Sequence, residues 1–342
     1  MKHALILAPF DGDCLARLRQ SLRVTYESWL DTGALHDPGV LARRLRDEQI
    51  SYLVVEADFV FEDVMEEAPL LEMIGVCRNA LNHIDLDAAT QRGILVVNAP
   101  GRNALAVAEL AIALMLGLAR PIGAAHRHIA ERQWQDPVAG YTQFRGVEIA
   151  GKTAGIIGLG AIGRLVAQRL RAFDMRVIAH DPFASAPRAA ELGAMLTDLD
   201  SLLATSDYVL IHAAATEATM GLIGATQLAR MKPTARLINT SAAGVVDEQA
   251  LIVALSAHRI AGAALDVFEG QPLPESSPLL ALDNVLLTPH MGGATAETVQ
   301  RQSAMISEDI LLALDGKQPR HLVKSAAWAI WQERHGRAAT QR

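Results

Sequence analysis

Short apolar blocks alternate with polar, helix-patterned stretches through the first part of the chain. The apolar blocks predict buried strands at residues 3–8, 24–27, 51–56, 71–77 and 93–98. Helical spacing of apolar residues predicts helices between several of them, at residues 14–22, 41–47 and 87–92. Strands that alternate with helices are typical of a parallel sheet covered on both faces. We therefore expect a small α/β domain that ends near residue 100.

The pattern changes after residue 100. A long apolar run, interrupted by Glu109, predicts a buried helix at residues 104–119, because it is too short and too polar for a membrane span. The stretch at residues 120–147 is less regular and carries three aromatic residues, Trp134, Tyr141 and Phe144. Exposed aromatic residues on such an arm indicate contact with a protein partner rather than catalysis.

A second alternation of strands and helices begins at Gly151. It predicts strands at residues 154–157, 177–179, 208–212, 235–239, 262–265 and 285–287. A last long helix, at about residues 295–314, is expected to return to the first domain. The tail at residues 335–342 is expected to be disordered.

The first strand of this second alternation runs into a glycine turn and then a helix. The turn has the spacing G-x-G-x-x-G, formed by Gly158, Gly160 and Gly163. In such a loop the first glycine permits a sharp turn, the second leaves room for a pyrophosphate, and the third lets the helix approach the sheet. The helix that begins at Ala161 and Ile162 offers free N–H groups to the phosphates. The strand–turn–helix context predicts a dinucleotide site.

Asp181 ends the next predicted strand, 23 residues after Gly158. A carboxylate at this position can accept hydrogen bonds from both hydroxyls of the adenosine ribose. It would also repel a 2′-phosphate, so the expected cofactor is NAD rather than NADP.

Length, charge and cysteine content narrow the class of protein. The 342 residues suggest two domains, and the net charge of −7 argues against a nucleic-acid partner. The cysteines Cys14 and Cys77 lack metal-ligand spacing, so no metal is expected, and they suit a reducing cytoplasm. No run has the length of a membrane helix, so no membrane partner is expected.

Several sequence blocks together resemble the D-isomer-specific 2-hydroxyacid dehydrogenases. The resemblance spans roughly residues 71–328 and rests on PGRNA from Pro100, the glycine loop, residues 231–251, GAALDVF from Gly262 and TPHMGGAT from Thr288. It implies two Rossmann-like or flavodoxin-like α/β domains, each a doubly wound parallel sheet, with a cleft between them. It also implies NAD as cofactor, a small acidic substrate and a homodimer.

The resemblance also implies a division of the chain. Residues 1–100 and 292–330 are expected to form the substrate domain. Residues 101–291 are expected to form the NAD-binding domain, with a dimerisation arm at about residues 120–147. Further cofactor contacts are expected from the family positions His212, Thr240, Asp266 and His290.

The family transfers a hydride between NAD and a 2-hydroxy or 2-keto acid with three side chains. A His moves the hydroxyl proton, a Glu orients that His, and an Arg holds the substrate carboxylate. His290 matches the first position. Gln271 stands at the Glu position, where it can still hydrogen-bond the His but brings no charge. Ala242 stands at the Arg position, so the carboxylate clamp is missing.

The expected substrate loop departs from the family as well. Arg78, Asn79 and Ala80 replace glycine-rich sequence that would present backbone N–H groups to a carboxylate. An anionic group could be held instead by Arg78, Arg102 or His83. Losing a clamp on a buried carboxylate costs about 2–5 kcal/mol, so turnover of ordinary 2-hydroxy acids is expected to be weak.

Three functions remain open on the sequence. The first is an NAD-dependent oxidoreductase that acts on the CH–OH group of an atypical hydroxy or keto acid, with His290 as acid and base. The second is a redox-neutral enzyme that keeps tightly bound NAD. The third is a non-catalytic NAD-binding regulatory protein. An intact glycine loop beside an altered substrate side favours the first.

Overall fold

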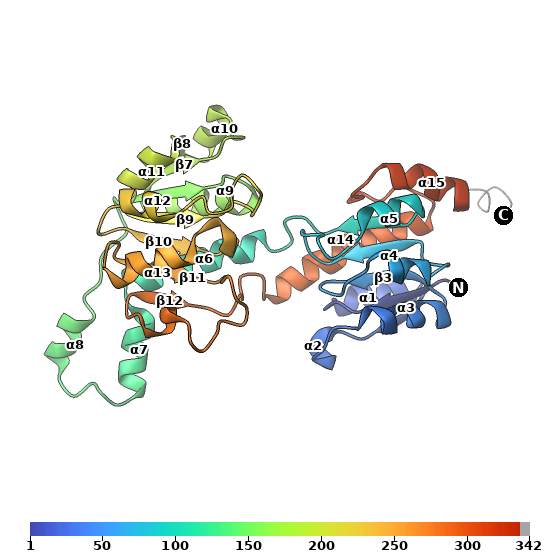
Figure 1. Cartoon of the computed structure of the whole chain (residues 1–342), viewed down its shortest axis with the longest axis horizontal. Helices are drawn as coiled ribbons and strands as arrows, with labels where there is room; N and C mark the ends of the chain where they lie inside the picture. Colours follow the sequence, from blue (N-terminus) through green and yellow to red (C-terminus); the bar gives the residue numbers. More distant parts are fainter. Residues whose placement is uncertain (336–342) are drawn as a thin grey trace. The chain divides into compact units, whose positions relative to one another are not determined.

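The computed structural model describes residues 1–335 as two compact units (Figure 1). Residues 1–102 and 295–335 form unit 1, and residues 103–294 form unit 2. The tail predicted to be disordered starts at residue 335, but His335 is the last residue of helix α15 (Ala326–His335). Its ring lies 5.1 Å from that of Trp331, one helical turn earlier. Residues 336–342 lie outside the described part of the chain.

Unit 1 contains a five-stranded parallel sheet in the order β2-β1-β3-β4-β5. Its strands are β1 (His3–Ile6), β2 (Arg23–Tyr26), β3 (Ile50–Val55), β4 (Met73–Val76) and β5 (Leu95–Asn98). All six residues of β3 are buried, as expected for a central strand with helices on both faces. This strand order is the flavodoxin-like one.

Alternate residues of the unit 1 strands enter two separate cores. Leu53 and Val55 pack in one core with helices α3 (Pro38–Asp47), α4 (Glu62–Glu66) and α5 (Leu86–Gln91). Tyr52 and Val54 pack in the other core with α1 (Gly12–Arg19), α14 (Ala296–Leu314) and α15. A short helix, α2 (Trp29–Thr32), follows β2. Helices α14 and α15 thus complete one face of the first sheet (Figure 1).

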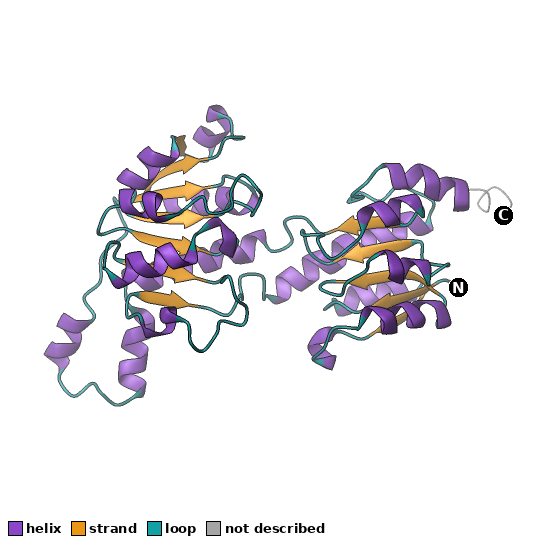
Figure 2. Ribbon diagram, in the orientation of Figure 1, coloured by secondary structure: helices purple, strands orange, loops and turns teal. Residues whose placement is uncertain are grey.

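Unit 2 contains a seven-stranded parallel sheet in the order β12-β11-β10-β9-β6-β7-β8 (Figure 2). Its strands are β6 (Thr153–Ile157), β7 (Arg176–His180), β8 (Ala194–Leu196), β9 (Tyr208–Ile211), β10 (Arg236–Asn239), β11 (Gly262–Leu265) and β12 (Val285–Leu287). The order reverses between β6 and β9. Dinucleotides bind at such a switch point, at the carboxyl ends of the strands.

Helices cover both faces of this sheet, which makes it doubly wound. One core is formed with α6 (Ala104–Ala119), α9 (Ala161–Arg171) and α10 (Ala186–Glu191). The other is formed with α11 (Leu199–Thr205), α12 (Ala225–Arg230) and α13 (Glu248–Ser256). Two short 3₁₀ segments, η1 (Ala243–Val245) and η2 (Pro278–Ala281), follow β10 and β11. The expected α/β class with parallel sheets is confirmed.

The stretch at residues 120–147 is more regular than its sequence indicated. It forms two helices, α7 (Ile122–Ala130) and α8 (Pro137–Gln143), that project from unit 2 (Figure 1). The Asp136 carboxylate caps α8 by accepting a hydrogen bond from the Val138 N–H at 2.9 Å, and Pro137 occupies the first turn. Neither helix contains a buried residue, so sequence periodicity towards a core was absent.

Within residues 1–335, no single helix is both long and apolar enough to cross a membrane. Helices α6 and α7 reach that length and apolarity only together, and they are bent by 67° at their junction.

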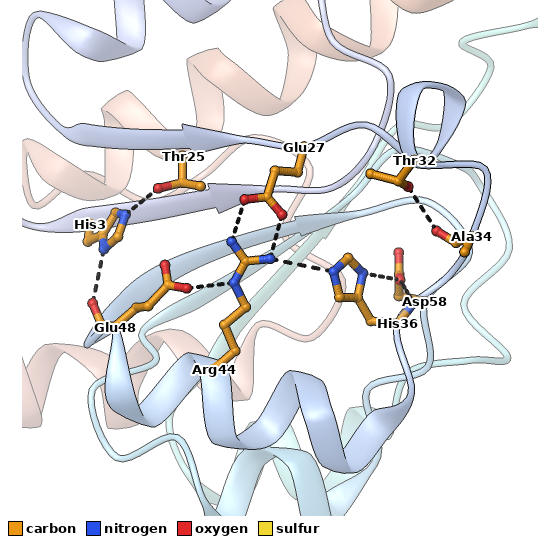
Figure 3. A network of polar contacts seen from close by, with 9 residues as sticks. All are labelled: His3, Thr25, Glu27, Thr32, Ala34, His36, Arg44, Glu48 and Asp58. Atoms are coloured by element: carbon orange, nitrogen blue, oxygen red, sulfur yellow. Dashed lines mark hydrogen bonds and ion pairs between the residues drawn. The ribbon is translucent and has the colours of Figure 1, made fainter.

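A polar network joins β2 to α3 in unit 1 (Figure 3). Both terminal nitrogens of Arg44 donate to the Glu27 carboxylate at 2.6 Å, and its Nε donates to Glu48 at 2.6 Å. The hydrogen bond from Arg44 holds the pKa of Glu27 below its ordinary value. Beside it, the backbone N–H of His36 donates to the buried Asp58 carboxylate at 2.9 Å. The network fixes the chain around the carboxyl end of β2.

Candidate dinucleotide and catalytic site

The three glycines of the predicted loop have three different surroundings. Gly158 has a φ of +92°, and a Cβ there would lie 2.7 Å from the Ala213 nitrogen. A Cβ on Gly163 would lie 2.1 Å from the Gly158 carbonyl oxygen. A Cβ on Gly160 would meet no atom of residues 1–335 within 4 Å. The loop is therefore tight at its first and third glycines and open to a ligand at its second, directly before α9.

Asp181 follows β7 and faces the glycine loop. Its carboxylate accepts hydrogen bonds from the backbone N–H groups of Leu159 at 2.7 Å and Phe183 at 2.8 Å. These bonds place a negative charge beside the turn that would receive the dinucleotide. The position agrees with the ribose-binding role that we predict for Asp181.

Two side chains at the switch point lack hydrogen-bond partners. Both ring nitrogens of His212 and the Thr240 hydroxyl are buried without a partner among residues 1–335. Burial lowers the pKa of His212 to about 4, so its ring is neutral near pH ~7. A buried polar group without a partner costs about 1–3 kcal/mol, which a bound ligand can recover. These orphaned atoms and the space at Gly160 fit a dinucleotide.

His290 lies in the segment after β12 and is hydrogen-bonded to Gln271. The distance from His290 Nδ1 to Gln271 Oε1 is 2.7 Å. The Gln271 amide nitrogen donates to the Phe268 carbonyl at 3.1 Å, which fixes the amide oxygen towards the ring. An amide oxygen only accepts, so Nδ1 carries the proton, and Nε2 of the exposed ring has no hydrogen-bond partner within residues 1–335. His290 has a φ of +52°, which is uncommon for a residue other than glycine.

Asp266 holds the segment that carries His290. Its buried carboxylate accepts hydrogen bonds from the Thr288 hydroxyl at 2.6 Å, from Met291 N–H at 2.9 Å and from Gly292 N–H at 2.8 Å. Both oxygens are thus occupied by this segment. The structure therefore gives Asp266 a positioning contact, in addition to the cofactor contact that we predict for it.

Ala242 lies in a loop closed by its neighbours. The Asn239 side chain donates to the Ala242 carbonyl at 3.0 Å and accepts from Ser241 N–H at 3.1 Å. The Ser241 hydroxyl donates to the Ala213 carbonyl at 2.6 Å, which ties this loop to the one after β9. Ala242 itself packs against the core formed with α11, α12 and α13. The position expected to clamp a carboxylate is therefore apolar.

The predicted substrate residues of unit 1 lie at the carboxyl ends of β4 and β5. Asn79 and Ala80 are exposed, and Asn98 donates through its side chain to the Asn79 carbonyl at 3.0 Å. Arg78 is half-buried, and its guanidinium forms no hydrogen bond or ion pair within residues 1–335. Arg78 is thus available to an anionic ligand.

Arg102 and His83, the two other residues predicted to hold an anionic group, differ from Arg78 in their surroundings. The Arg102 guanidinium is paired with the Glu56 carboxylate and hydrogen-bonded to the buried Gln302 side chain. Burial, and secondarily the charge of Arg78, lower the pKa of His83 to about 4, so its ring is neutral near pH ~7. Of the three candidates, Arg78 is therefore the one whose guanidinium has no partner within residues 1–335, and the substrate contact predicted for Arg102 stays a prediction.

Sequence reasoning did not single out Glu56, Gln302 or Ser241. Glu56 directly follows a buried strand. That position could have indicated a residue at the carboxyl edge of the sheet, where ligands bind in such folds. Gln302 is fully buried on α14, where only its side-chain contacts to Arg102 and to the Pro9 carbonyl show its role. Nothing in the sequence distinguished Ser241 from its neighbours in the segment that follows β10.

Comparisons with known proteins agree with this geometry. The model of the D-isomer specific 2-hydroxyacid dehydrogenase NAD-binding domain matches residues 112–292. The chain is 45% identical over 261 residues to D-3-phosphoglycerate dehydrogenase of Archaeoglobus fulgidus, covering 76% of this chain and 49% of that protein. It is 41% identical over 288 residues to glyoxylate reductase of Thermofilum pendens, covering 83% of each. The chain thus spans about half the length of the phosphoglycerate dehydrogenase.

Solved structures show the same similarity. The apo structure of D-lactate dehydrogenase from Escherichia coli has a TM-score of 0.80 and 29% sequence identity, and the match covers 95% of this chain and 100% of that one. A nicotinamide dinucleotide is therefore the ligand that the glycine loop, His212 and Thr240 fit. The chain belongs to the D-isomer-specific 2-hydroxyacid dehydrogenases, a family of NAD-dependent oxidoreductases that act on CH–OH groups.

Proposed function

We propose that this protein interconverts a hydroxyl and a carbonyl group on an atypical hydroxy or keto acid, with His290 as the acid–base residue. The observation that carries the proposal is the hydrogen bond of 2.7 Å between His290 Nδ1 and Gln271 Oε1. Nε2 of the exposed ring has no partner among the described residues, which supports its proposed contact with a substrate hydroxyl. NAD, when bound, accepts or supplies the hydride.

The protein's part in the reaction is the movement of one proton. In oxidation, Nε2 of His290 accepts the proton of the substrate hydroxyl, and in reduction the protonated nitrogen returns it. Gln271 holds the ring through Nδ1 and is itself held by the Phe268 carbonyl. Asp266 fixes the backbone on both sides of His290. These contacts support a defined orientation of the ring whose Nε2 we propose to transfer the proton.

For the substrate we propose an anionic group that Arg78 binds. Arg78 is the arginine of the predicted substrate loop whose guanidinium has no partner within residues 1–335, whereas Arg102 is paired with Glu56. Ala242 supplies no charge, so the substrate is not expected to be an ordinary 2-hydroxy acid. Asn79 and Ala80 are proposed to line the same loop surface.

We also propose a homodimer, with α7 and α8 as its arm. These helices and the loop between them expose several large apolar side chains, namely Ile122, Ile129, Trp134, Val138 and Tyr141. A hollow of about 190 Å³ between the helices is lined by Trp134 and Tyr141 among others. Exposed apolar patches of this kind mark protein interfaces. The two free cysteines support a location in the reducing cytoplasm.

The test is turnover of a panel of hydroxy acids and their methyl esters by the full chain with NAD⁺, followed by NADH absorbance. We expect His290→Asn to lower kcat by about 100-fold or more, because general acid–base catalysis is lost. His258→Asn is the matched control, since His258 is also exposed, has a φ of +48° and follows α13 away from the site. Absence of turnover with the whole panel, or equal kcat in both variants, would refute the proposal.

A further inference from the structure

A hollow of about 450 Å³ lies in unit 2 at the amino ends of β7 and β8. It is lined by Arg171, the last residue of α9, by Arg176, the first residue of β7, and by the turn between α10 and β8. Strands β7 and β8 and helix α10 lie together at one end of the strand order (Figure 1). The glycine loop and Asp181 follow the carboxyl ends of β6 and β7, so the hollow lies at the opposite edge of the sheet.

Gly193 gives this hollow its shape. It follows α10 with a φ of +67°, a conformation that favours glycine, and its N–H donates to the Ala190 carbonyl at 2.8 Å. A Cβ on Gly193 would overlap Cδ, Nε and Cζ of Arg171. Because glycine has no side chain, Arg171 can lie across the turn that leads into β8. The Arg171 side chain is therefore packed along the wall of the hollow.

Two unpaired cations line the hollow. The guanidinium groups of Arg171 and Arg176 form no hydrogen bond and no ion pair within residues 1–335. Other arginines of unit 2 have partners: Arg169 donates to a backbone carbonyl of its own helix at 3.1 Å, and Arg230 is paired with Asp200. Among the described residues, no acid lines the hollow. Like charges that share a hollow repel each other, and an anion bound between them removes the repulsion.

The rest of the wall is mostly apolar. Met175, Val177 and Ile178 come from β7 and the residue before it, and Met195 comes from β8. Met195 is 63% exposed, and its flexible thioether can pack against an apolar ligand. The volume of the hollow lies in the range of small-molecule sites. The hollow thus combines two cations with an apolar surface.

From these contacts we infer that the hollow binds a small phosphorylated molecule. Its phosphate lies between Arg171 and Arg176, and its apolar part packs against Met195. A phosphate monoester carries a charge of about −1.5 to −2 near pH ~7, which matches two guanidinium groups. Guanidinium groups also hold phosphate oxygens through paired hydrogen bonds. This site lies apart from the cofactor and substrate contacts described above, and the inference does not depend on the proposed function.

Calorimetric titration of the full chain saturated with NADH tests the inference, because the bound cofactor then occupies the glycine loop. Phenyl phosphate is the probe, and we expect it to bind with a Kd of about 1 mM or lower. Inorganic phosphate lacks the apolar part and should bind at least about threefold more weakly. Absence of phenyl phosphate binding at about 10 mM, or equally tight binding of inorganic phosphate, would overturn the inference.

Matched variants locate the binding. Arg171→Gln combined with Arg176→Gln should weaken phenyl phosphate binding at least about tenfold. Arg19→Gln combined with Arg23→Gln is the control, since these exposed arginines hold the corresponding places in unit 1, at the last residue of α1 and the first of β2. Met195→Glu adds a carboxylate beside the hollow and should also weaken binding. The unchanged affinity in the variant of Arg171 and Arg176, or an equal loss in the control, would place the binding elsewhere and overturn the inference.

Discussion

Asp181 combines a structural contact with a charge that we predict to select the cofactor. Its carboxylate accepts hydrogen bonds from Leu159 N–H and Phe183 N–H, which hold it at the end of β7. A 2′-phosphate on the adenosine ribose would meet this fixed negative charge. The predicted preference for NAD over NADP thus rests on one residue and its two backbone partners.

We predict that Asp181→Asn raises the affinity for NADPH relative to NADH by about tenfold or more, because a like-charge repulsion is removed. Fluorescence titration with both reduced cofactors measures the ratio. Asp198→Asn is the control, since Asp198 carries the same charge at the same edge of the sheet and caps α11. If the ratio is unchanged in Asp181→Asn, or changes equally in Asp198→Asn, the selective role of Asp181 is excluded.

The contacts of some site residues could be predicted from the sequence, and those of others could not. The glycines at 158 and 163 were predictable because their spacing reports a local backbone requirement: Gly158 has a positive φ, and a Cβ on Gly163 would meet the Gly158 carbonyl of the same turn. Arg102 was not, because its partners Glu56 and Gln302 lie 46 and 200 positions away in the chain. Whether a surface arginine is free or paired depends on such long-range packing, which a local motif does not encode.

At the scale of elements, Asp266 joins the end of β11 to the segment after β12. Three hydrogen bonds to one buried carboxylate make this junction stiff. We predict that Asp266→Asn destabilises the protein by about 2–4 kcal/mol, because an amide can accept at only one of the two positions and leaves a buried N–H without a partner. It should also lower kcat, since the His290 segment loses its support.

Denaturant unfolding and steady-state kinetics measure the two effects together. Thr288→Val is the control because it removes one of the three bonds and keeps the carboxylate; its expected cost is about 1 kcal/mol. Equal stability of Asp266→Asn and the unchanged protein would show that the junction does not depend on the carboxylate.

The ion pair of Glu27 with Arg44 joins β2 to α3. It makes the stability of unit 1 depend on pH in the acid range. The hydrogen bond from Arg44 lowers the pKa of Glu27 from its ordinary value of 4.5. A carboxyl whose pKa is lowered in the folded state stabilises the fold when the pH is above the ordinary pKa of that carboxyl. That stabilisation is lost as the pH falls through the lowered value, because protonation then breaks the pair.

We therefore predict that Glu27→Gln lowers the melting temperature at about pH 7 and has little effect at about pH 2. Thermal unfolding of both proteins across this range gives the difference. Glu66→Gln serves for comparison, since the Glu66 side chain is 61% exposed in its ion pair with Arg92 and should change stability less. A Glu27→Gln difference that persists undiminished at about pH 2 would contradict the assigned cause.

Elements with several buried residues were predictable. The central strand β3 and the long helix α6 are mostly buried, so their apolar pattern is visible in the sequence. The edge strands β2 and β12 contain no buried residue and were still predicted from their apolar residues. Helices α7 and α8 bury no residue, and the three-residue strand β8 lies at the edge of its sheet. Because α8 has no side that faces a core, the capping residues Asp136 and Pro137 were the remaining local indication of this helix.

At the scale of the whole molecule, the arm of α7 and α8 predicts how the chain assembles. Val138 and Tyr141 are 70% and 73% exposed on α8, next to Trp134 at 55%. A homodimer would bury this apolar surface, and the cores of such interfaces are depleted of charged residues. A new carboxylate at the centre of the arm would have to be desolvated in the dimer, at a cost of several kcal/mol.

We accordingly predict that Val138→Glu converts a dimer to a single chain, measured as the mass by analytical ultracentrifugation over a dilution series. Val253→Glu is the matched control, because Val253 is 68% exposed on α13 and lies outside the arm. That variant should retain the mass of the unchanged protein. NADH titration of Val138→Glu should give the unchanged affinity, since the glycine loop lies in a separate part of unit 2. A single-chain mass for the unchanged protein at every concentration, or a dimer of Val138→Glu as stable as the original, would show that the exposed arm is not an interface between copies of this chain.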